Sequence, residues 1–350
     1  MKKLKILFLG EYTYPIITGS STHKVQVNLF DNLSQMGITS YFFEVCKTEN
    51  KLSKIFGKIK LIKQINNSFV YTGGIIPFIF FIIFRINIIH FIVQRKYQLF
   101  FLPLVFLPWI KSFITLHDTL NFKKNPYFNK FPKSINFIKQ FLVLFVSKIL
   151  VYNELDKNYL PEIIKKKVIL VKNGIHKIET NLAVKEKENY ILFAGGTSLI
   201  KGYEIISQIA KSTNYKFIIA GVNKQGENIA TENIQFIGLI PSDKMYDYIK
   251  KAKIVIIPSL YDTFSVLALE SLYLGTPIII SQRCGISRYL KHLEDAIIVE
   301  PDDTKQIIKF IDLLFNDKDL YSKLYKNSSK LIEKFTWDII SKEYIEIYEK

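Results

Sequence analysis

Cysteine is scarce in this sequence, which argues against a fold held together by disulfides or by zinc. Cys46 and Cys284 are the only two cysteines among 350 residues, and no CxxC pair occurs. We therefore expect neither a disulfide framework nor a zinc cluster, and a reducing cytoplasm is the expected compartment. The basic start MKKLKILFLGEY has an apolar stretch of only about six residues before a glycine turn, so it predicts a first strand rather than a secretory signal.

Long hydrophobic runs are also missing. The most apolar segment, residues 75–93, is interrupted by Pro77, Arg85, Asn87 and His90. Its longest uninterrupted part is about ten residues, whereas a helix that spans a bilayer needs about 20. The segment predicts a buried helix followed by a buried parallel strand.

A second apolar run, residues 99–110, allows two interpretations. Its sequence, LFFLPLVFLPWI, is again too short to span a bilayer. One interpretation is a core helix that faces a sheet. Because the run contains aromatics and two prolines and has lysines on both sides, the other is a segment that lies in a lipid interface.

Acidic residues are scarce in the first half of the chain. Residues 1–170 contain 24 basic and 8 acidic side chains, a net charge of +16, whereas residues 171–350 contain 24 and 23, a net charge of +1. Such an asymmetry indicates a polyanionic partner, which can be nucleic acid, an anionic membrane surface or an acidic substrate. A codon bias towards lysine is the alternative, but it would load both halves equally. No RNA-binding motif occurs, so we do not expect nucleic acid.

What the sequence does contain is a strand–helix rhythm that occurs twice. Short apolar runs alternate with amphipathic stretches, the first of them over residues 22–36, and the rhythm restarts after the polar stretch HKIETNLAVKEKEN. We expect an α/β protein with two Rossmann-like, doubly wound parallel sheets that face each other across a cleft. The N-terminal domain is expected at residues 1–172 and the C-terminal domain at 173–335. The main ligand site should lie at the carboxyl ends of the strands.

Residues 257–281 form the densest group of chemically useful side chains. A buried strand ends at Pro258, a loop carries Asp262, and a helix that starts near residues 263–265 carries Glu270. A helix start binds anions, and carboxylates accept hydrogen bonds from sugar hydroxyls, so the segment suits a nucleotide sugar. The alternative is that Asp262 only caps the helix and Glu270 lies on the surface.

The stretch YILFAGGTSLIKGYEII offers a second anion site. A strand enters a glycine turn at Gly195 and Gly196, and Lys201 stands at the start of the next helix, where its amine can reach a diphosphate. The stretch is neither a GxxxxGK[ST] loop nor a GxGxxG fingerprint. By itself this lysine is a weak signal.

Taken together, these segments resemble glycosyltransferase family 4, whose members have the two-domain GT-B fold. The resemblance extends along nearly the whole chain, with the segments in family order: TYPIITGSS, FITLHD, VKNGI, ILFAGG followed by KG, FIIAG, IQFIGLI, VIIPS, YDTFSVLALES and GTPIIIS. The terminal FTWDIISKEYIEIY is similar to the family's last helix, which implies that residues 336–350 pack back on the first domain. Its amphipathic pattern gives these candidate buried positions: Phe335, Trp337, Ile340, Tyr344 and Tyr348.

The resemblance implies a donor site in the second domain. Asp262 and Glu270 match the two acids of the family's motif, which are separated by seven residues. Glu270 would hold the ribose hydroxyls and Asp262 the hydroxyls of the donor sugar. The backbone amides of Phe264, Ser265 and Val266 would meet the diphosphate and the sugar.

Further roles follow from the same resemblance. Lys201 matches the diphosphate lysine, and Gly19 with Ser20 matches a first-domain glycine loop that closes on the donor. His117 matches a histidine near the reacting centre, with a strand-end histidine bonded to backbone as the alternative. For His90, a place in the core is the preferred interpretation.

The sequence also departs from the family pattern. Gly196 stands where an arginine usually accompanies the lysine, Asp262 is shorter than the usual glutamate, and Ser265 stands where glycine is common. Arg283 or Arg288 is a candidate to supply the missing positive charge.

The family reaction is transfer of a sugar from a nucleoside diphosphate sugar with retention of configuration. The resemblance implies no metal or other cofactor besides this co-substrate, and Lys201 with the helix amides would stabilise the leaving diphosphate. The expected acceptor is a lipid-linked or cell-surface glycan on the inner face of a membrane. The lysines expected to rest on anionic headgroups are those at 51, 54, 58, 60, 63, 123, 124, 130 and 133. The alternatives are a catalytically silent protein that binds a nucleotide sugar or supports a partner enzyme, and a UDP-sugar 2-epimerase.

Overall fold

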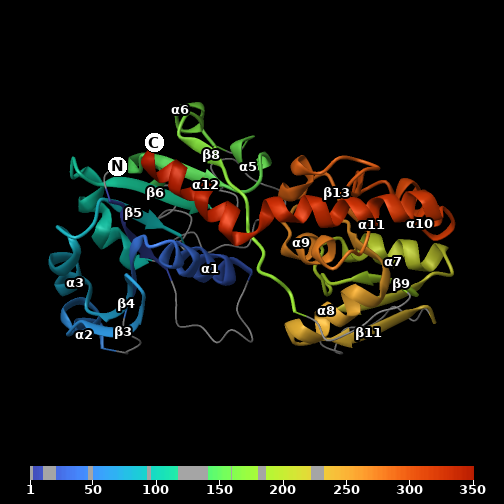
Figure 1. Cartoon of the computed structure of the whole chain (residues 1–350), viewed down its shortest axis with the longest axis horizontal. Coiled ribbons are helices and arrows are strands. Elements are labelled where there is room, and N and C mark those ends of the chain that lie inside the picture. The colour runs from blue at the N-terminus through green and yellow to red at the C-terminus, as the bar shows by residue number, and fades with distance from the viewer. Residues whose placement is uncertain are drawn as a thin grey trace. The chain divides into compact units, whose positions relative to one another are not determined.

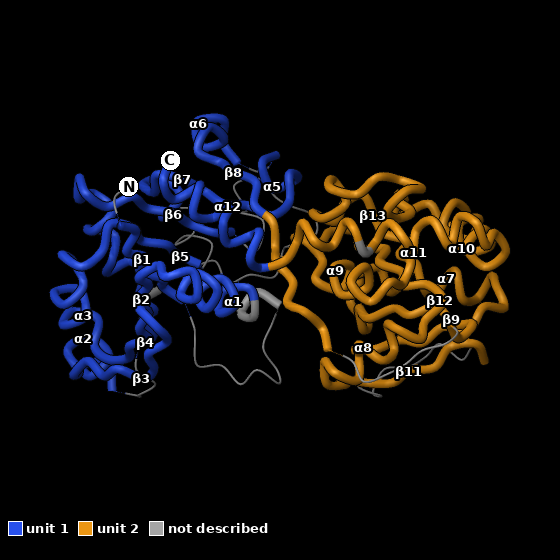
Figure 2. The backbone as a smooth tube through the Cα atoms, viewed as in Figure 1, with its two compact units in different colours: residues 1–171, 337–350 blue, residues 172–336 orange. Residues whose placement is uncertain are grey.

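The chain folds into two compact units. The computed structural model describes residues 3–10, 21–45, 50–92, 96–116, 141–158, 160–179, 187–221 and 232–350. One unit is Met1–Val171 with Trp337–Lys350, and the other is Lys172–Thr336 (Figure 2). In both units strands alternate with helices along the chain (Figure 1). No helix in the described part of the chain is long and apolar enough to cross a membrane.

The first unit is built around an eight-stranded sheet in the order β3-β4-β2-β1-β5-β6-β7-β8. Its strands are β1 (Lys5–Leu9), β2 (Thr39–Val45), β3 (Lys60–Ile65), β4 (Ser68–Gly73), β5 (Ile88–Phe91), β6 (Lys111–Leu116), β7 (Lys148–Val151) and β8 (Val168–Leu170). Its helices are α1 (Ser21–Gln35), α2 (Lys51–Phe56), α3 (Ile75–Ile82), the 3₁₀ helix η1 (Lys96–Phe106), α5 (Leu155–Asn158), α6 (Glu162–Lys165) and α12 (Trp337–Glu349).

The apolar runs of the first half form the interior of this unit. β1 pairs in parallel with β2 on one side and β5 on the other, and Ile6 to Leu9 are fully buried. Such continuous apolar strands are typical of a parallel sheet covered on both faces. The prediction for residues 75–93 is confirmed, because this run forms helix α3 and then the buried strand β5.

One edge of the first sheet differs from the parallel pattern. β3 runs antiparallel to β4, and its side chains are mostly exposed. The two strands are joined by Asn66 and Asn67, and Asn66 has φ +49°, the left-handed conformation that two-residue hairpins favour. The lysines of β3, Lys60 and Lys63, discourage pairing with a further strand at this open edge.

The second unit holds a fully parallel sheet in the order β11-β10-β9-β12-β13-β14. Its strands are β9 (Glu188–Phe193), β10 (Lys216–Ala220), β11 (Ile234–Gly238), β12 (Ala252–Ile257), β13 (Ile278–Ser281) and β14 (Ile297–Val299). Its helices are α7 (Tyr203–Ser212), α8 (Ser242–Lys251), α9 (Val266–Tyr273), η2 (Gly285–Tyr289), α10 (Thr304–Asn316), α11 (Lys318–Ile332) and η3 (Glu333–Phe335). From β9 the chain builds outward to β11 and then returns to place β12 on the other side of β9.

The last helix, α12, packs in the first unit, where it contacts α1. All five positions predicted to be buried in the terminal segment, from Phe335 to Tyr348, are at most 2% exposed. The hydroxyl of Tyr348 lies 2.7 Å from Nδ1 of His90, and Nε2 of His90 lies 2.7 Å from the hydroxyl of Thr115. His90 is therefore a fully buried core residue with both ring nitrogens hydrogen-bonded, as its sequence context favours.

Candidate functional site

The second sheet reverses its direction of construction between β9 and β12, which lie side by side. In doubly wound sheets, ligands bind at the carboxyl ends of the strands at such a switch point. The two loops that leave these carboxyl ends are residues 194–202 and 258–265. They carry the predicted site residues Lys201 and Asp262.

Lys201 and Asp262 are in direct contact. The Lys201 Nζ donates a hydrogen bond to Asp262 Oδ2 at 2.7 Å, so the two side chains form an ion pair. The Asp262 side chain is 13% exposed and that of Lys201 is 40% exposed. The two opposite charges therefore cancel at the carboxyl ends of β9 and β12. The lysine is the more accessible of the two side chains.

The backbone around Lys201 is fixed against the end of β12. Gly202 has φ +86°, and a Cβ at this position would overlap the carbonyl oxygen of Pro258. The amide of Leu260 donates a hydrogen bond to the carbonyl oxygen of Ile200 at 2.8 Å. Because the two loops touch on both sides of the lysine, the position of the Lys201 Cα is set by the sheet.

The glycine turn after β9 is also closely packed. Gly196 has φ +58°, its amide donates to the carbonyl oxygen of Ala220 at 3.0 Å, and a Cβ there would lie 2.5 Å from the carbonyl oxygen of Gly221. A Cβ at Gly195 would overlap the ring of Phe193. Both glycines therefore have a packing role, and the site provides no room for the arginine that the family resemblance expects at position 196.

Helix α9 begins beside this pair. It starts at Val266 rather than at residues 263–265, and the buried Ser265 before it has φ +81°, a conformation that favours glycine. The Phe264 ring packs against Tyr289 and Phe335, both at 6.2 Å between ring centroids, and its carbonyl oxygen accepts a hydrogen bond from Ile286. The first amides of a helix have no partner within the helix, so α9 offers donors for an anion close to Lys201.

Glu270 lies on the second turn of α9. Its Oε1 accepts a hydrogen bond from the hydroxyl of Tyr246 in α8 at 3.4 Å. Burial and the neighbouring Glu270 charge raise the pKa of Tyr246 to about 12, so the tyrosine stays protonated and donates to the carboxylate at neutral pH. Tyr246 orients the carboxylate, and it escaped the sequence analysis because it lies on a different helix with no shared motif.

Three of the predicted site residues, Gly19, Ser20 and His117, lie outside the described residues. Their expected roles stay predictions. Within the described ranges, no cluster of three or more His, Cys, Asp or Glu side chains is placed to hold a metal ion.

With this geometry in place, the chain can be compared with known proteins. Residues 175–331 match the family model for glycosyl transferases group 1. The match covers nearly the whole second unit and includes Lys201, Asp262 and Glu270.

Two relatives and one solved structure extend the comparison. The chain is 29% identical over 210 residues to an uncharacterized glycosyltransferase of Methanocaldococcus jannaschii, across 52% of this chain and 54% of that protein. It is 26% identical over 233 residues to a Campylobacter jejuni α-1,4-N-acetyl-D-galactosaminyltransferase whose name specifies a PP-undecaprenol-linked acceptor, across 62% and 64%. Thus the chain aligns with only about half to two thirds of these relatives' lengths.

The solved structure is that of HepE from Anabaena in complex with UDP-glucose. It superimposes with a TM-score of 0.68 at 14% sequence identity, and the match covers 99% of both chains. The fold is therefore GT-B, as the sequence predicts.

Cys284 is a further neighbour of Asp262 in the second unit. Its backbone forms a bridge with Asp262, and the Gly285 amide donates to the Asp262 carbonyl oxygen at 3.1 Å. Burial and then the Asp262 charge raise the pKa of the Cys284 thiol well above its usual value, which leaves it neutral and unreactive. Cys284 thus positions the Asp262 loop. Sequence spacing did not reveal this contact, because the two residues lie in separate loops.

The two arginines proposed to replace the missing cation have partners of their own. Arg283 Nη2 lies 2.7 Å from Asp302 Oδ2 and 3.6 Å from Glu300 Oε2. The Arg288 guanidinium lies 5.7 Å from the centroid of the Tyr289 ring. Arg283, like Lys201, is thus paired with carboxylates, and a role for either arginine as the second cation stays a prediction.

Proposed function

We propose that this GT-B chain is a glycosyltransferase that moves a sugar from a nucleoside diphosphate sugar to a hydroxyl of a lipid-linked or cell-surface glycan. One observation carries the proposal: the Lys201–Asp262 pair stands at the switch point of the second sheet, at the start of α9. A cation and helix amides suit a diphosphate, and a carboxylate suits sugar hydroxyls. The match to glycosyl transferases group 1 over the same unit supports it.

Each residue has a separate task in this proposal. The diphosphate draws the Lys201 ammonium away from Asp262, and the released carboxylate accepts hydrogen bonds from hydroxyls of the donor sugar. The Glu270 carboxylate, oriented by Tyr246, accepts hydrogen bonds from the two ribose hydroxyls. The Lys201–Asp262 ion pair thus holds both groups where the donor is proposed to bind.

The proposed reaction is a retaining transfer in which the leaving group is stabilised electrostatically. The bond between the anomeric carbon and the diphosphate breaks, the acceptor oxygen bonds to that carbon on the same face, and the acceptor proton passes to the leaving diphosphate. Lys201 and the first amides of α9 act on the charge that develops on the diphosphate, which is the kind of stabilisation that lowers barriers most. Because the protein supplies this charge, we expect activity to persist in EDTA.

The acceptor is inferred from the first half of the chain and from one relative. The net charge of +16 over residues 1–170 suits an anionic membrane surface, and the Campylobacter jejuni relative is named for a PP-undecaprenol-linked acceptor. We therefore place the protein in the cytoplasm, peripheral on the inner face of the membrane, in the synthesis of a cell-surface polysaccharide.

A second candidate is a catalytically silent GT-B protein that binds a nucleotide sugar or supports a partner transferase. The observation that favours it is Gly196, whose packing leaves no room for the arginine that the resemblance expects. It differs from the first proposal in one measurable respect, since it predicts donor binding without turnover.

The test is release of nucleoside diphosphate from a panel of UDP-, GDP- and ADP-sugars, with and without lipid-linked oligosaccharides as acceptors. We expect one donor to turn over, with the acceptor accelerating it, and we expect the same rate in EDTA. Turnover of no donor by a folded protein that still binds one would select the silent protein. Loss of all turnover in EDTA, with rescue by Mg²⁺ or Mn²⁺, would contradict the metal-free reaction.

A further inference from the structure

The 3₁₀ helix η1 and the turn after it present apolar side chains on two sides. A 3₁₀ helix repeats every three residues, so side chains at i and i+3 line up. One side, with Phe101 and Leu104, is buried in the core. The residues one position earlier in each three-residue repeat are exposed. They form what we call the ridge: Phe100, Pro103, Phe106 and Trp109.

The ridge is continuous past the end of the helix. The amides of Leu107 and Ile110 donate to the carbonyl oxygens of Leu104 and Leu107, which continues the three-residue repeat up to Trp109. Phe100, Phe106 and Trp109 are 46%, 63% and 44% exposed, so about half of each large ring faces outward. At roughly 2 Å per residue, the ridge is about 18 Å long.

Other aromatic rings widen the ridge. The Phe84 ring, 81% exposed in the turn after α3, stacks on Trp109 with 6.3 Å between ring centroids and an interplanar angle of 19°. The Phe145 ring packs against Phe106 with 5.4 Å between ring centroids. Phe80, one helical turn before Phe84, is 76% exposed. An exposed aromatic cluster of this size marks a docking surface for an apolar or interfacial partner.

In the sequence around the ridge the charges are of one sign, although Glu349 of α12 lines the same pocket as Trp109. Residues 50–117 contain nine lysines and arginines and no aspartate or glutamate. Arg85 follows Phe84, Lys111 follows Trp109 by two positions, and both are exposed. Aromatic side chains flanked by cations are typical of segments that lie at the headgroup level of an anionic bilayer.

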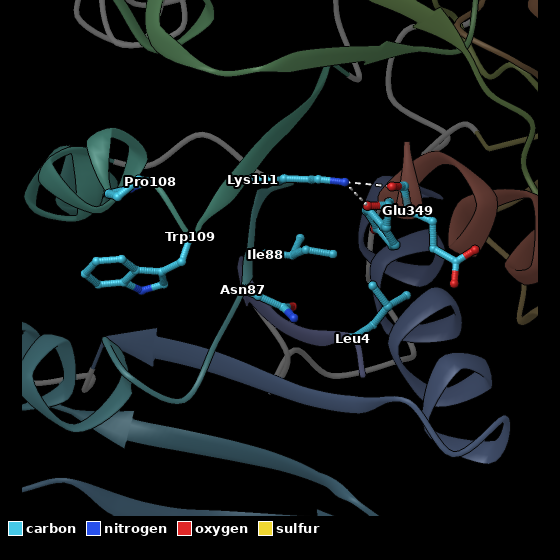
Figure 3. Close-up of a pocket in the computed structure, with 8 residues that line it drawn as sticks. Leu4, Asn87, Ile88, Pro108, Trp109, Lys111 and Glu349 are labelled. Carbon is cyan, nitrogen blue, oxygen red and sulfur yellow. Dashed lines mark hydrogen bonds between the residues drawn. The ribbon is translucent and has the colours of Figure 1, made fainter. Parts of the chain in front are cut away.

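Trp109 also forms one side of a pocket of about 430 Å³ at the amino ends of β5 and β6 (Figure 3). Lys111, the first residue of β6, extends across this pocket and donates to the carbonyl oxygens of Tyr348 at 3.4 Å and Glu349 at 2.7 Å. The lysine is held at the end of α12 by these bonds. Its ammonium group is therefore fixed on the side of the pocket that lies across from Trp109.

The other end of the ridge is tied to the carboxyl edge of the sheet. The hydroxyl of Tyr97 donates to the carbonyl oxygen of Gly10 at 3.0 Å, and Nε2 of Gln98 donates to that of Leu9 at 2.9 Å, both at the end of β1. The ridge therefore begins beside the strand ends where an acceptor is expected and runs to the opposite edge of the sheet.

We infer that the ridge inserts into the boundary between headgroups and acyl chains of an anionic bilayer. This inference rests on the proposed function in one respect, namely that a membrane carries the acceptor. It assigns the membrane contact to the ridge, with basic residues as supporting charges, rather than to the lysines alone. The acid-free sequence around the ridge favours lipid over a protein partner, whose surface would usually supply charges of both signs.

The test is flotation with vesicles of phosphatidylcholine that contain about one third phosphatidylglycerol. The double variant Phe106→Ser/Trp109→Ser removes the centre and end of the ridge, and the control Leu239→Ser removes an apolar side chain of the second unit that is 73% exposed. We expect the double variant to have a partition coefficient about ten-fold lower than the wild type, and the control to equal the wild type. Melting curves should show that all three proteins are folded at the assay temperature, because about half of each substituted ring already faces outward.

Tryptophan fluorescence supplies a second readout. The chain has two tryptophans, and Trp337 is only 2% exposed, so quenching by brominated lipid reports on Trp109. Equal vesicle binding by the wild type and the double variant, or no quenching of bound wild type, would overturn the inference and leave binding to the lysines alone. Failure of the wild type to bind any vesicle would overturn it as well. Donor turnover by the double variant in detergent should match the wild type, so a failed transferase proposal would show separately.

Discussion

The two sheets follow the same winding rule but are built to meet different partners. In the second unit the cation at the switch point, Lys201, is matched by Asp262, and the net charge of residues 171–350 is only +1. In the first half of the chain the net charge is +16, the first unit carries an exposed aromatic ridge, and Lys111 near the end of that ridge donates to backbone carbonyls. Matched charges fixed by close backbone contacts suit one small ligand, whereas an excess of basic residues together with an apolar ridge suits an extended surface.

The largest effect should come from removal of the matched cation. Lys201→Met removes the group proposed to stabilise the leaving diphosphate, so we expect donor turnover to fall by a factor of about 10²–10³. Lys216→Met, which replaces an exposed lysine at the start of β10, is the control and should retain the wild-type rate. A Lys201→Met rate within about two-fold of the wild type would remove the basis for a donor site at this edge.

The close packing at the switch point can be separated from backbone strain. Gly196 and Gly37 both have positive φ, but a Cβ at Gly196 would lie 2.5 Å from the Gly221 carbonyl oxygen, whereas a Cβ at Gly37 would meet nothing within 4 Å. We expect Gly196→Ala to lower the free energy of unfolding by about 2 kcal/mol more than Gly37→Ala does, measured by urea denaturation. Equal losses would show that the turn can open, in which case Gly196→Arg should raise donor affinity.

A smaller effect concerns Lys187, a partly buried lysine of the second unit. Lys187 Nζ donates to the Lys250 carbonyl oxygen and the Thr276 hydroxyl, each at 2.7 Å, and burial followed by the nearby charges of Lys250 and Lys253 lowers its pKa to about 8. Between about pH 8 and 10.5 the unfolded chain binds more protons at this side chain than the folded chain does. The free energy of unfolding therefore rises with pH in this window. The increase is lost again as the pH falls towards 8.

The measurement compares the free energies of unfolding of the wild type and Lys187→Met at two pH values. Between about pH 7.5 and about pH 9.5, the wild type should gain about 1–2 kcal/mol relative to the variant. Lys216→Met serves as the exposed control for the second unit. A difference that does not change with pH would mean that Lys187 titrates as an ordinary exposed lysine.

Much of the fold follows from periodicity, because buried strands and amphipathic helices leave repeats in the sequence. The helix predicted at residues 22–36 is α1 at Ser21–Gln35. β3 was not predicted, because an exposed lysine-rich edge strand has no apolar pattern and is held by the Asn66–Asn67 turn. For residues 99–110 the core interpretation is confirmed for one side of η1, where Phe101 and Leu104 are buried. A lipid interface for the exposed side stays a prediction.

The candidate site was predictable as a set of residue types but not as a set of contacts. Motif spacing placed Lys201 and Asp262 in loops after strands, but only the adjacency of β9 and β12 brings the two charges to 2.7 Å. Tyr246 and Cys284 belong to segments without recognisable motifs, and they join the site through packing. Spacing along one segment cannot reveal such partners.

The central claim is that the switch point of the second sheet binds a nucleotide sugar. Its most direct test is calorimetric titration with UDP, GDP, ADP and their glucose, galactose, mannose and N-acetylated sugars, on the wild type and on Glu270→Ala. We predict that one nucleotide series binds the wild type and that Glu270→Ala, folded as shown by its melting curve, loses this binding. Binding to none of them by the folded wild type, or equal binding by the variant, would contradict the claim.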